Sequence, residues 1–205
     1  MFHASIRQPA AAGSFYPEAS AELAATVDAL LEAASAPVLG RPKGLIVPHA
    51  GYVYSGPIAA SAYAALKTMN PKPTRVVLLG PSHHVGFSGL ALPGVDALQT
   101  PLGVVQLDRD VVQALVERMG VLQSPMAHAR EHSLEVQLPF LQRVLGEFQI
   151  VPLVVGRATV DEMAAVIEFL WGGAETLFVV STDLSHYLPY REAVAAAVAK
   201  GAVVV

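Results

Sequence analysis

Short apolar runs alternate with segments of helical periodicity along this chain, and this alternation constrains the fold more than any other feature. We predict strands at residues 44–47, 75–79, 103–107, 149–155 and 176–181. We predict helices at residues 20–34, 57–66, 108–119, 131–145 (interrupted near Pro139), 160–170 and from 190 to the end. Strands separated by helices are typical of an α/β domain. The sequence therefore predicts a mostly parallel or mixed central sheet flanked by helices, in one domain over residues 1–205.

Composition excludes several classes of protein. The 205 residues carry 13 basic and 17 acidic side chains, and a formal charge of −4 is a poor basis for binding nucleic acid or an anionic membrane. Every apolar run ends well before the roughly 18 residues that a membrane helix needs. The first residues contain no apolar signal region. We therefore expect a soluble, cytoplasmic protein with no nucleic-acid or membrane partner.

Histidines follow three of the predicted strands. His49, His83 and His186 each lie shortly beyond a different strand, and His84 is the neighbour of His83. Because the carboxyl ends of parallel strands meet at one edge of a sheet, we expect these imidazoles to gather there. A single histidine after a strand is more often a hydrogen-bonded loop residue than a ligand, but three such strands favour a functional site. Since the chain has no cysteine, a metal must be held by histidine, carboxylate, carbonyl or water.

Two carboxylates accompany histidines in the sequence. Asp183 lies near His186, and Glu131 is next to His132. A cluster of histidines and carboxylates can hold a divalent metal ion or carry out general acid–base chemistry. Plainer interpretations remain open for the acidic residues. Glu131 and Glu135 are four residues apart and could share one solvated face of a helix, and Asp183 could cap a helix.

Other polar and aromatic residues are weaker candidates. Tyr52 and Tyr54 could line a pocket or belong to the core, since both kinds of aromatic residue look alike in sequence. We expect His84 to be structural or to support a neighbouring ligand. We expect His3 and His128 to be surface or loop residues.

Serine-based hydrolysis is a further alternative. Ser82, Ser133 and Ser185 each lie near a histidine in the sequence. A metal-free hydrolase that uses Ser82 or Ser185 therefore stays open, although the chain lacks a G-x-S-x-G elbow. It also lacks the Walker A and G-x-G-x-x-G loops that cradle phosphates.

Five motifs, taken together, resemble one known family. They occur in the order RQPAAAGSFYP (7–17), PHAGYVYSG (48–56), GPSHH (80–84), EHSLEVQLP (131–139) and STDLSH (181–186). This set is similar to the Memo family, whose prokaryotic members are called AmmeMemoRadiSam system protein B. No single motif is specific, but five in the family's order are.

The resemblance implies a fold like that of the class III extradiol dioxygenases, which are non-haem iron enzymes. It implies a metal site in which His49 and His83 match the family's metal-binding histidines, and we expect Fe(II) or Cu as the ion. His132 and His186 match pocket histidines, for which the resemblance implies acid–base or substrate-orienting roles, and Asp183 would orient His186 or another ligand. The family name also implies partners, namely a radical-SAM protein and an AMMECR-type protein.

The chain departs from the family pattern at its end. Family members usually continue further and carry a cysteine that completes the metal site, whereas this chain reaches Val205 without a cysteine. The third protein ligand is then unknown, with Asp183, His186, Glu131 or water as the alternatives. We expect a labile metal site and an exposed sheet edge that favours homo-oligomers.

Two functions are therefore hypotheses for this chain. The first is a metal-dependent redox enzyme in which His132 or His186 moves protons. The second is a non-catalytic partner protein whose dioxygenase-like pocket recognises a peptide or a small molecule. Bound metal with turnover would favour the first, and ligand binding without metal would favour the second.

Overall fold

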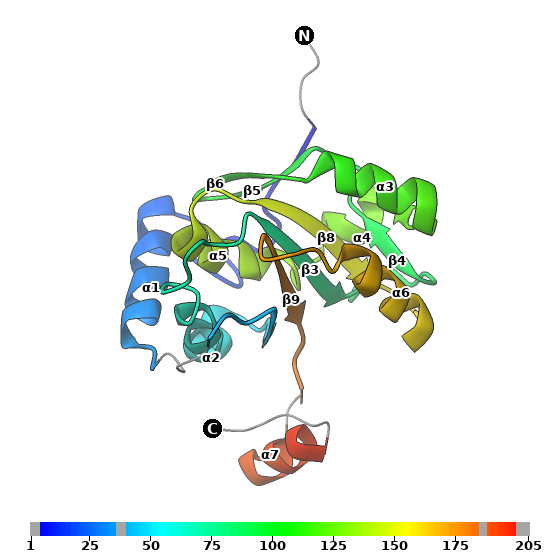
Figure 1. Ribbon diagram of the computed structural model, residues 1–205. Coiled ribbons are helices and arrows are strands. Elements are labelled where there is room, and N and C mark those ends of the chain that lie inside the picture. Colours follow the sequence, from blue (N-terminus) through cyan, green and yellow to red (C-terminus); the bar gives the residue numbers. More distant parts are fainter. Residues whose placement is uncertain (1–4, 36–39, 185–187, 200–205) are drawn as a thin grey trace.

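A six-stranded mixed sheet forms the centre of the computed structural model, which describes residues 5–35, 40–184 and 188–199 (Figure 1). The strand order is β2 (Gly44–Val47), β9 (Thr176–Ser181), β3 (Arg75–Pro81), β8 (Gln149–Val155), β4 (Leu90–Leu92) and β7 (Leu122–Gln123). The first four strands are parallel to one another, and β4 runs antiparallel to β8. The predicted α/β class with a mixed central sheet is therefore confirmed.

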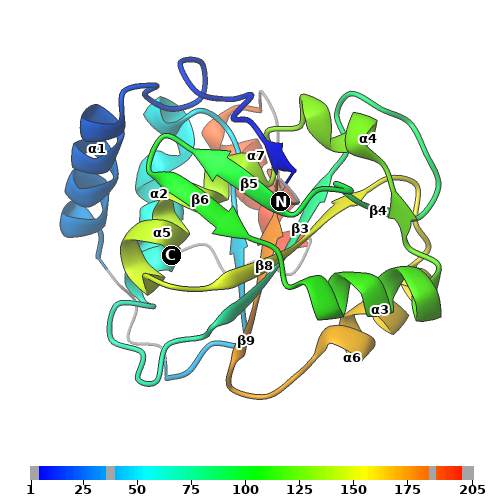
Figure 2. The ribbon, with the colours of Figure 1, turned by 90° about the horizontal axis from the view of Figure 1, so that it is seen from above.

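Helices cover both faces of this sheet (Figure 2). One face packs against α1 (Ser20–Ala33), α2 (Tyr52–Ala64) and α5 (Leu138–Leu145), and the other against α3 (Arg109–Met119) and α6 (Val160–Leu170). Strand β3 shows why both faces must be covered, because its residues alternate between two apolar cores. Val76 and Leu78 belong to the first core, whereas Val77 and Leu79 belong to the second. Strands buried in this way on both faces have continuous apolar sequences.

Smaller elements complete the fold. A second sheet has the order β1 (Ile6–Arg7), β5 (Ala97–Thr100) and β6 (Gly103–Gln106). The remaining helices are α4 (Pro125–Ala129), the 3₁₀ turn η1 (Glu135–Gln137) and α7 (Tyr190–Ala199). The strand predicted at residues 103–107 thus lies in the second sheet, and the short strands β1, β4, β5 and β7 were not predicted. None of the helices in the described part of the chain has the length and hydrophobicity that a bilayer crossing requires.

Two predicted helix starts are wrong, and both errors concern proline. Helix α2 begins at Tyr52, and Pro57 lies inside it on the exposed side, where water can satisfy the carbonyl that proline leaves without a donor. The helix predicted from residue 131 begins only at Leu138. Pro139 lies in its first turn, where a missing N–H costs nothing, so this proline starts the helix rather than interrupting it.

Candidate metal centre

Three histidines from separate segments converge at the carboxyl edge of the main sheet. His49 follows β2, His83 follows β3, and His132 lies in the loop before η1. Each can offer one ring nitrogen so that the three atoms lie within 4.8 Å of one another. The ring centroids of His83 and His132 are 4.5 Å apart, and that of His49 lies 5.1 Å and 5.7 Å from them. Imidazoles at this spacing could hold a metal ion.

Glu131 holds His83 in place. One carboxylate oxygen accepts from the backbone N–H of His83 at 2.7 Å, and the other lies 2.8 Å from its Nδ1. The second oxygen also accepts from the backbone N–H of Ser133. Burial raises the pKa of this carboxyl, but these hydrogen bonds outweigh burial and bring the pKa down to about 2. An ionised carboxylate only accepts hydrogen bonds, so Nδ1 of His83 is a donor, and in the neutral ring Nε2 is the nitrogen with the lone pair.

His49 is the most buried of the three histidines, with 2% of its surface exposed. Its backbone N–H donates to Asp183 Oδ1 at 2.8 Å, and its Nδ1 lies 3.1 Å from the hydroxyl of Ser181. Asp183 Oδ2 is 3.7 Å from Nε2 on the other side of the ring. Burial lowers the pKa of His49 more than the Asp183 charge raises it, which favours a neutral imidazole.

His132 is held between two flat rings. It stacks on Phe15 with a centroid separation of 4.2 Å and on His83 at 4.5 Å. Burial lowers the pKa of His132 to about 4, although the Glu131 charge opposes this. A neutral ring at neutral pH has an electron pair to offer to a cation. The family resemblance implies an acid–base or substrate-orienting role for His132, and the structure brings it together with both histidines predicted as metal ligands.

Phe15 reaches His132 because the segment of residues 7–16 is tied down by Glu135. Its carboxylate accepts from the Arg7 guanidinium, from the Tyr16 hydroxyl and from two backbone N–H groups, those of residues 10 and 11. Glu131 and Glu135 are 2% and 1% exposed. Their interpretation as one solvated helix face is therefore wrong, since each carboxylate is buried and surrounded by donors.

Four other predicted residues lie around or outside this centre. Tyr52 is a core residue whose hydroxyl donates to the Val136 carbonyl at 2.7 Å, whereas Tyr54 is 83% exposed on α2. Ser82 donates through its hydroxyl to the Val85 carbonyl. The ring of His84 is exposed and lies 6.5 Å from that of His83.

Three further histidine and serine expectations concern His128, His186 and Ser185. His128 was predicted at the surface or in a loop, and this is wrong. It lies in α4, is 3% exposed, and bonds through Nε2 to the Ala91 carbonyl at 2.8 Å. His186, predicted to be a pocket histidine, and Ser185, predicted as an alternative nucleophile, lie outside the described residues.

Sequence reasoning missed three residues that shape the centre. These are Phe15, Ser181 and Gln137, and the last donates through its amide to the Ser181 hydroxyl. All three lie within the five motifs, so their position was a usable signal. None of the three was predicted, because a search for titratable groups does not detect a stacking ring or a neutral hydrogen-bond partner.

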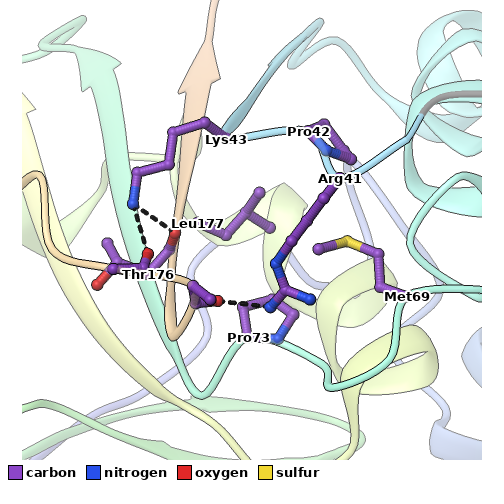
Figure 3. Close-up of a pocket in the computed structure, with 9 residues that line it drawn as sticks. Arg41, Pro42, Lys43, Met69, Pro73, Thr176 and Leu177 are labelled. Atoms are coloured by element: carbon purple, nitrogen blue, oxygen red, sulfur yellow. Dashed lines mark hydrogen bonds between the residues drawn. The ribbon is translucent and has the colours of Figure 1, made fainter.

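A separate pocket lies at the opposite edge of the sheet, where β2 and β9 begin (Figure 3). Two cationic side chains line it. Arg41 donates to the Ala174 carbonyl at 2.7 Å, and Lys43 donates to the carbonyls of Gly173 and Thr176 at 2.8 Å and 3.0 Å. Because both cationic groups already donate to backbone carbonyls, we infer that these side chains stabilise the starts of the two strands and do not form a ligand site.

Comparison with known proteins yields one consistent family. The family model described as Memo-like protein matches residues 7–200. A MEMO1 family protein from Aquifex aeolicus is 38% identical over 192 residues, covering 92% of this chain and 70% of the relative. One from Aeropyrum pernix is 39% identical over 203 residues, covering 91% of this chain and 72% of the relative. One from Methanopyrus kandleri is also 39% identical, over 204 residues, covering 91% of this chain and 71% of the relative.

Proposed function

We propose that this chain, which belongs to the Memo family, binds a redox-active divalent metal ion through His49, His83 and His132. The convergence of one nitrogen from each ring within 4.8 Å carries this proposal. Iron(II) and copper are the ions we propose, because both bind well to imidazole nitrogen.

The donor set fits such an ion. His83 directs a lone pair outward because Glu131 accepts the proton of its other nitrogen, an arrangement typical of histidine ligands. Burial favours the neutral forms of His49 and His132, which are the forms that bind metals. Asp183 Oδ2, 3.7 Å from His49 Nε2, supports a carboxylate ligand beside the histidines.

We propose redox catalysis as the finer function of this centre. A bound iron or copper ion would supply electron transfer and a binding position for a small ligand. The chain's own residues would orient and shield it. Glu131 fixes the His83 ring, and Phe15 covers one face of His132 and so limits the access of water to that side.

Metal analysis tests the binding proposal. The full chain would be purified without chelator or a nickel column, and its metal content measured by inductively coupled plasma mass spectrometry. We expect near-stoichiometric iron or copper in the native chain and almost none in the double variant His49→Ala/His83→Ala. The matched control is His84→Ala, which removes an exposed neighbouring imidazole and should keep the metal.

Absence of metal from the native chain, even after anaerobic incubation with iron(II) or copper(II), would contradict the proposal. Recognition of a peptide or small molecule by the same pocket would then be the leading function. Metal binding without dioxygen consumption across a panel of aromatic diols and thiols would retain the metal site and count against redox catalysis.

A further inference from the structure

We propose that Ser181 and Gln137 form a neutral hydrogen-bond relay that holds His49 with its proton on Nδ1, so that Nε2 presents its lone pair to the metal centre. Both are positioning residues that act through His49. The inference rests on the proposed function, because the direction of this lone pair matters only where a cation binds.

The Ser181 hydroxyl has one proton and three polar neighbours. This oxygen lies 2.6 Å from the Ser133 carbonyl, 2.9 Å from Gln137 Nε2 and 3.1 Å from His49 Nδ1. A carbonyl only accepts, so the single hydroxyl proton goes to Ser133. A hydroxyl oxygen then has two lone pairs left, and both neighbouring nitrogens must donate to them. Nδ1 of His49 therefore carries its proton.

The orientation of the Gln137 amide is fixed independently. Its Oε1 accepts from the Tyr63 hydroxyl at 2.9 Å, and its Nε2 donates to the Pro48 carbonyl at 2.9 Å. A flipped amide would set two oxygens against each other at Pro48 and would leave the Tyr63 hydroxyl proton without this acceptor. Gln137 is 1% exposed, so water cannot replace these partners. The amide thus offers Ser181 a donor and never an acceptor.

The opposite tautomer of His49 fits the structure poorly at Nδ1. With its proton on Nε2, the ring would need a donor at Nδ1, but the Ser181 proton is already given to Ser133. The Nε2 proton would be attracted by the charge of Asp183 Oδ2, but at 3.7 Å it would form no hydrogen bond to offset the unmatched Nδ1. With the proton on Nδ1, the lone pair of Nε2 instead faces Asp183 Oδ2 at 3.7 Å. Two ligand atoms of one cation can lie this far apart.

Nitrogen NMR on the metal-free full chain tests the relay directly. Long-range ¹H–¹⁵N correlation at about pH 8, above the ordinary histidine pKa, separates protonated from unprotonated ring nitrogens. The His49 signals would be identified by their loss in His49→Gln. We expect a protonated Nδ1 and an unprotonated Nε2 in the native chain. A proton on Nε2 would overturn the inference, and this measurement needs no variant in the relay itself.

Two serine variants separate the relay from general packing. Ser181→Ala removes the hydroxyl acceptor at Nδ1 and leaves the Gln137 amide as a donor on that side. The hydrogen bond of His49 to the Ser181 backbone remains, so we expect His49 to shift only partly toward the Nε2-protonated form. Ser133→Ala removes a similar buried bond, from its hydroxyl to the Pro81 carbonyl, and should leave the His49 tautomer unchanged. An unchanged His49 pattern in folded Ser181→Ala would overturn the role of Ser181.

Metal titration completes the test, with zinc as a probe that undergoes no redox chemistry. We expect Ser181→Ala to bind zinc about tenfold more weakly than the native chain, the usual effect of losing a partner that orients a ligand. A native chain that binds no metal but carries its proton on Nδ1 would contradict the proposed function and leave the relay standing. A chain that binds metal with the proton on Nε2 would do the reverse.

Discussion

At the scale of single residues, the three clustered histidines are held by three different kinds of neighbour. His83 is anchored by the carboxylate of Glu131, His49 by the neutral hydroxyl of Ser181, and His132 by stacking on Phe15. A carboxylate partner increases the basicity of an imidazole ligand, whereas a neutral hydroxyl mainly fixes its orientation. We therefore expect His83 to be the stronger electron donor to a bound cation.

His128 gives a pH prediction that is independent of the cluster. Burial lowers its pKa to about 4, and the bond to the Ala91 carbonyl only partly opposes this. In the unfolded chain the pKa returns to about 6.5, so the unfolded state binds a proton first as the pH falls. Stability is therefore lost between about pH 6.5 and pH 4, by up to about 3 kcal/mol at about 1.4 kcal/mol per pH unit.

The measurement is urea unfolding of the native chain and of His128→Gln at several pH values between neutral and mildly acidic. The native chain should lose more stability over this range than the variant, because glutamine does not titrate. The same variant leaves the other histidines in place, so their titration cancels in the comparison. Parallel stability curves for the two chains would show that His128 is not the group responsible.

At the scale of secondary-structure elements, the centre depends on how closely one loop approaches one strand. A Cβ added at Gly80, near the end of β3, would lie 2.8 Å from Ser133 Oγ and 2.8 Å from Leu134 Cδ2. Glycine therefore lets the loop of residues 131–134 lie directly against the strand. This close approach brings Glu131 and His132 to His83.

Gly80→Ala should push this loop away from β3. We expect a loss of about 1–3 kcal/mol in unfolding free energy from overpacking, together with weaker metal binding because Glu131 and His132 move with the loop. Gly86→Ala is the matched control, since a Cβ there meets nothing within 4 Å. Denaturant unfolding and zinc titration of both variants check the prediction, and equal behaviour of the two would contradict it.

At the scale of the whole molecule, Glu135 joins residues 7–16 to the middle of the chain, and we call this set of contacts the closure. This carboxylate binds Arg7, 128 residues away, and the Tyr16 hydroxyl, 119 residues away. Burial raises the pKa of Tyr16, and the Glu135 charge raises it further, so the hydroxyl stays protonated and donates. Arg7 also donates to the carbonyls of His128 and Glu131. The first residues of the described chain are thus packed around the loop that carries Glu131 and His132 of the candidate metal centre.

Glu135→Gln should loosen this closure. The Arg7 charge would lose its partner while its side chain is only 8% exposed, and breaking a buried ion pair typically costs about 3–5 kcal/mol. Hydrogen exchange should also become faster at the backbone N–H groups of Ala10 and Ala11, which donate to this carboxylate. Glu117→Gln, on the exposed face of α3, should change stability by no more than about 0.5 kcal/mol. Unchanged exchange at both amides would refute the closure.

The sequence by itself determined the α/β class, most of the strands of the main sheet and the positions of His49 and His83 just beyond two of them. These features are local, because the period of apolar residues sets strand or helix, and a parallel strand brings the residues after it to a known edge of the sheet. Short strands such as β4 and β7 could not be predicted, because two or three residues are too few to show a period of apolar residues.

Only the tertiary structure decided which groups meet. It brought His132 to the two strand-end histidines, turned Glu131 and Glu135 inward, and set Phe15 and Ser181 against the rings. Those contacts join positions far apart in the chain, 132 residues in the case of His49 and Ser181. They depend on the direction of each side chain and on how closely a loop can approach a strand, and hydrophobic periodicity contains neither.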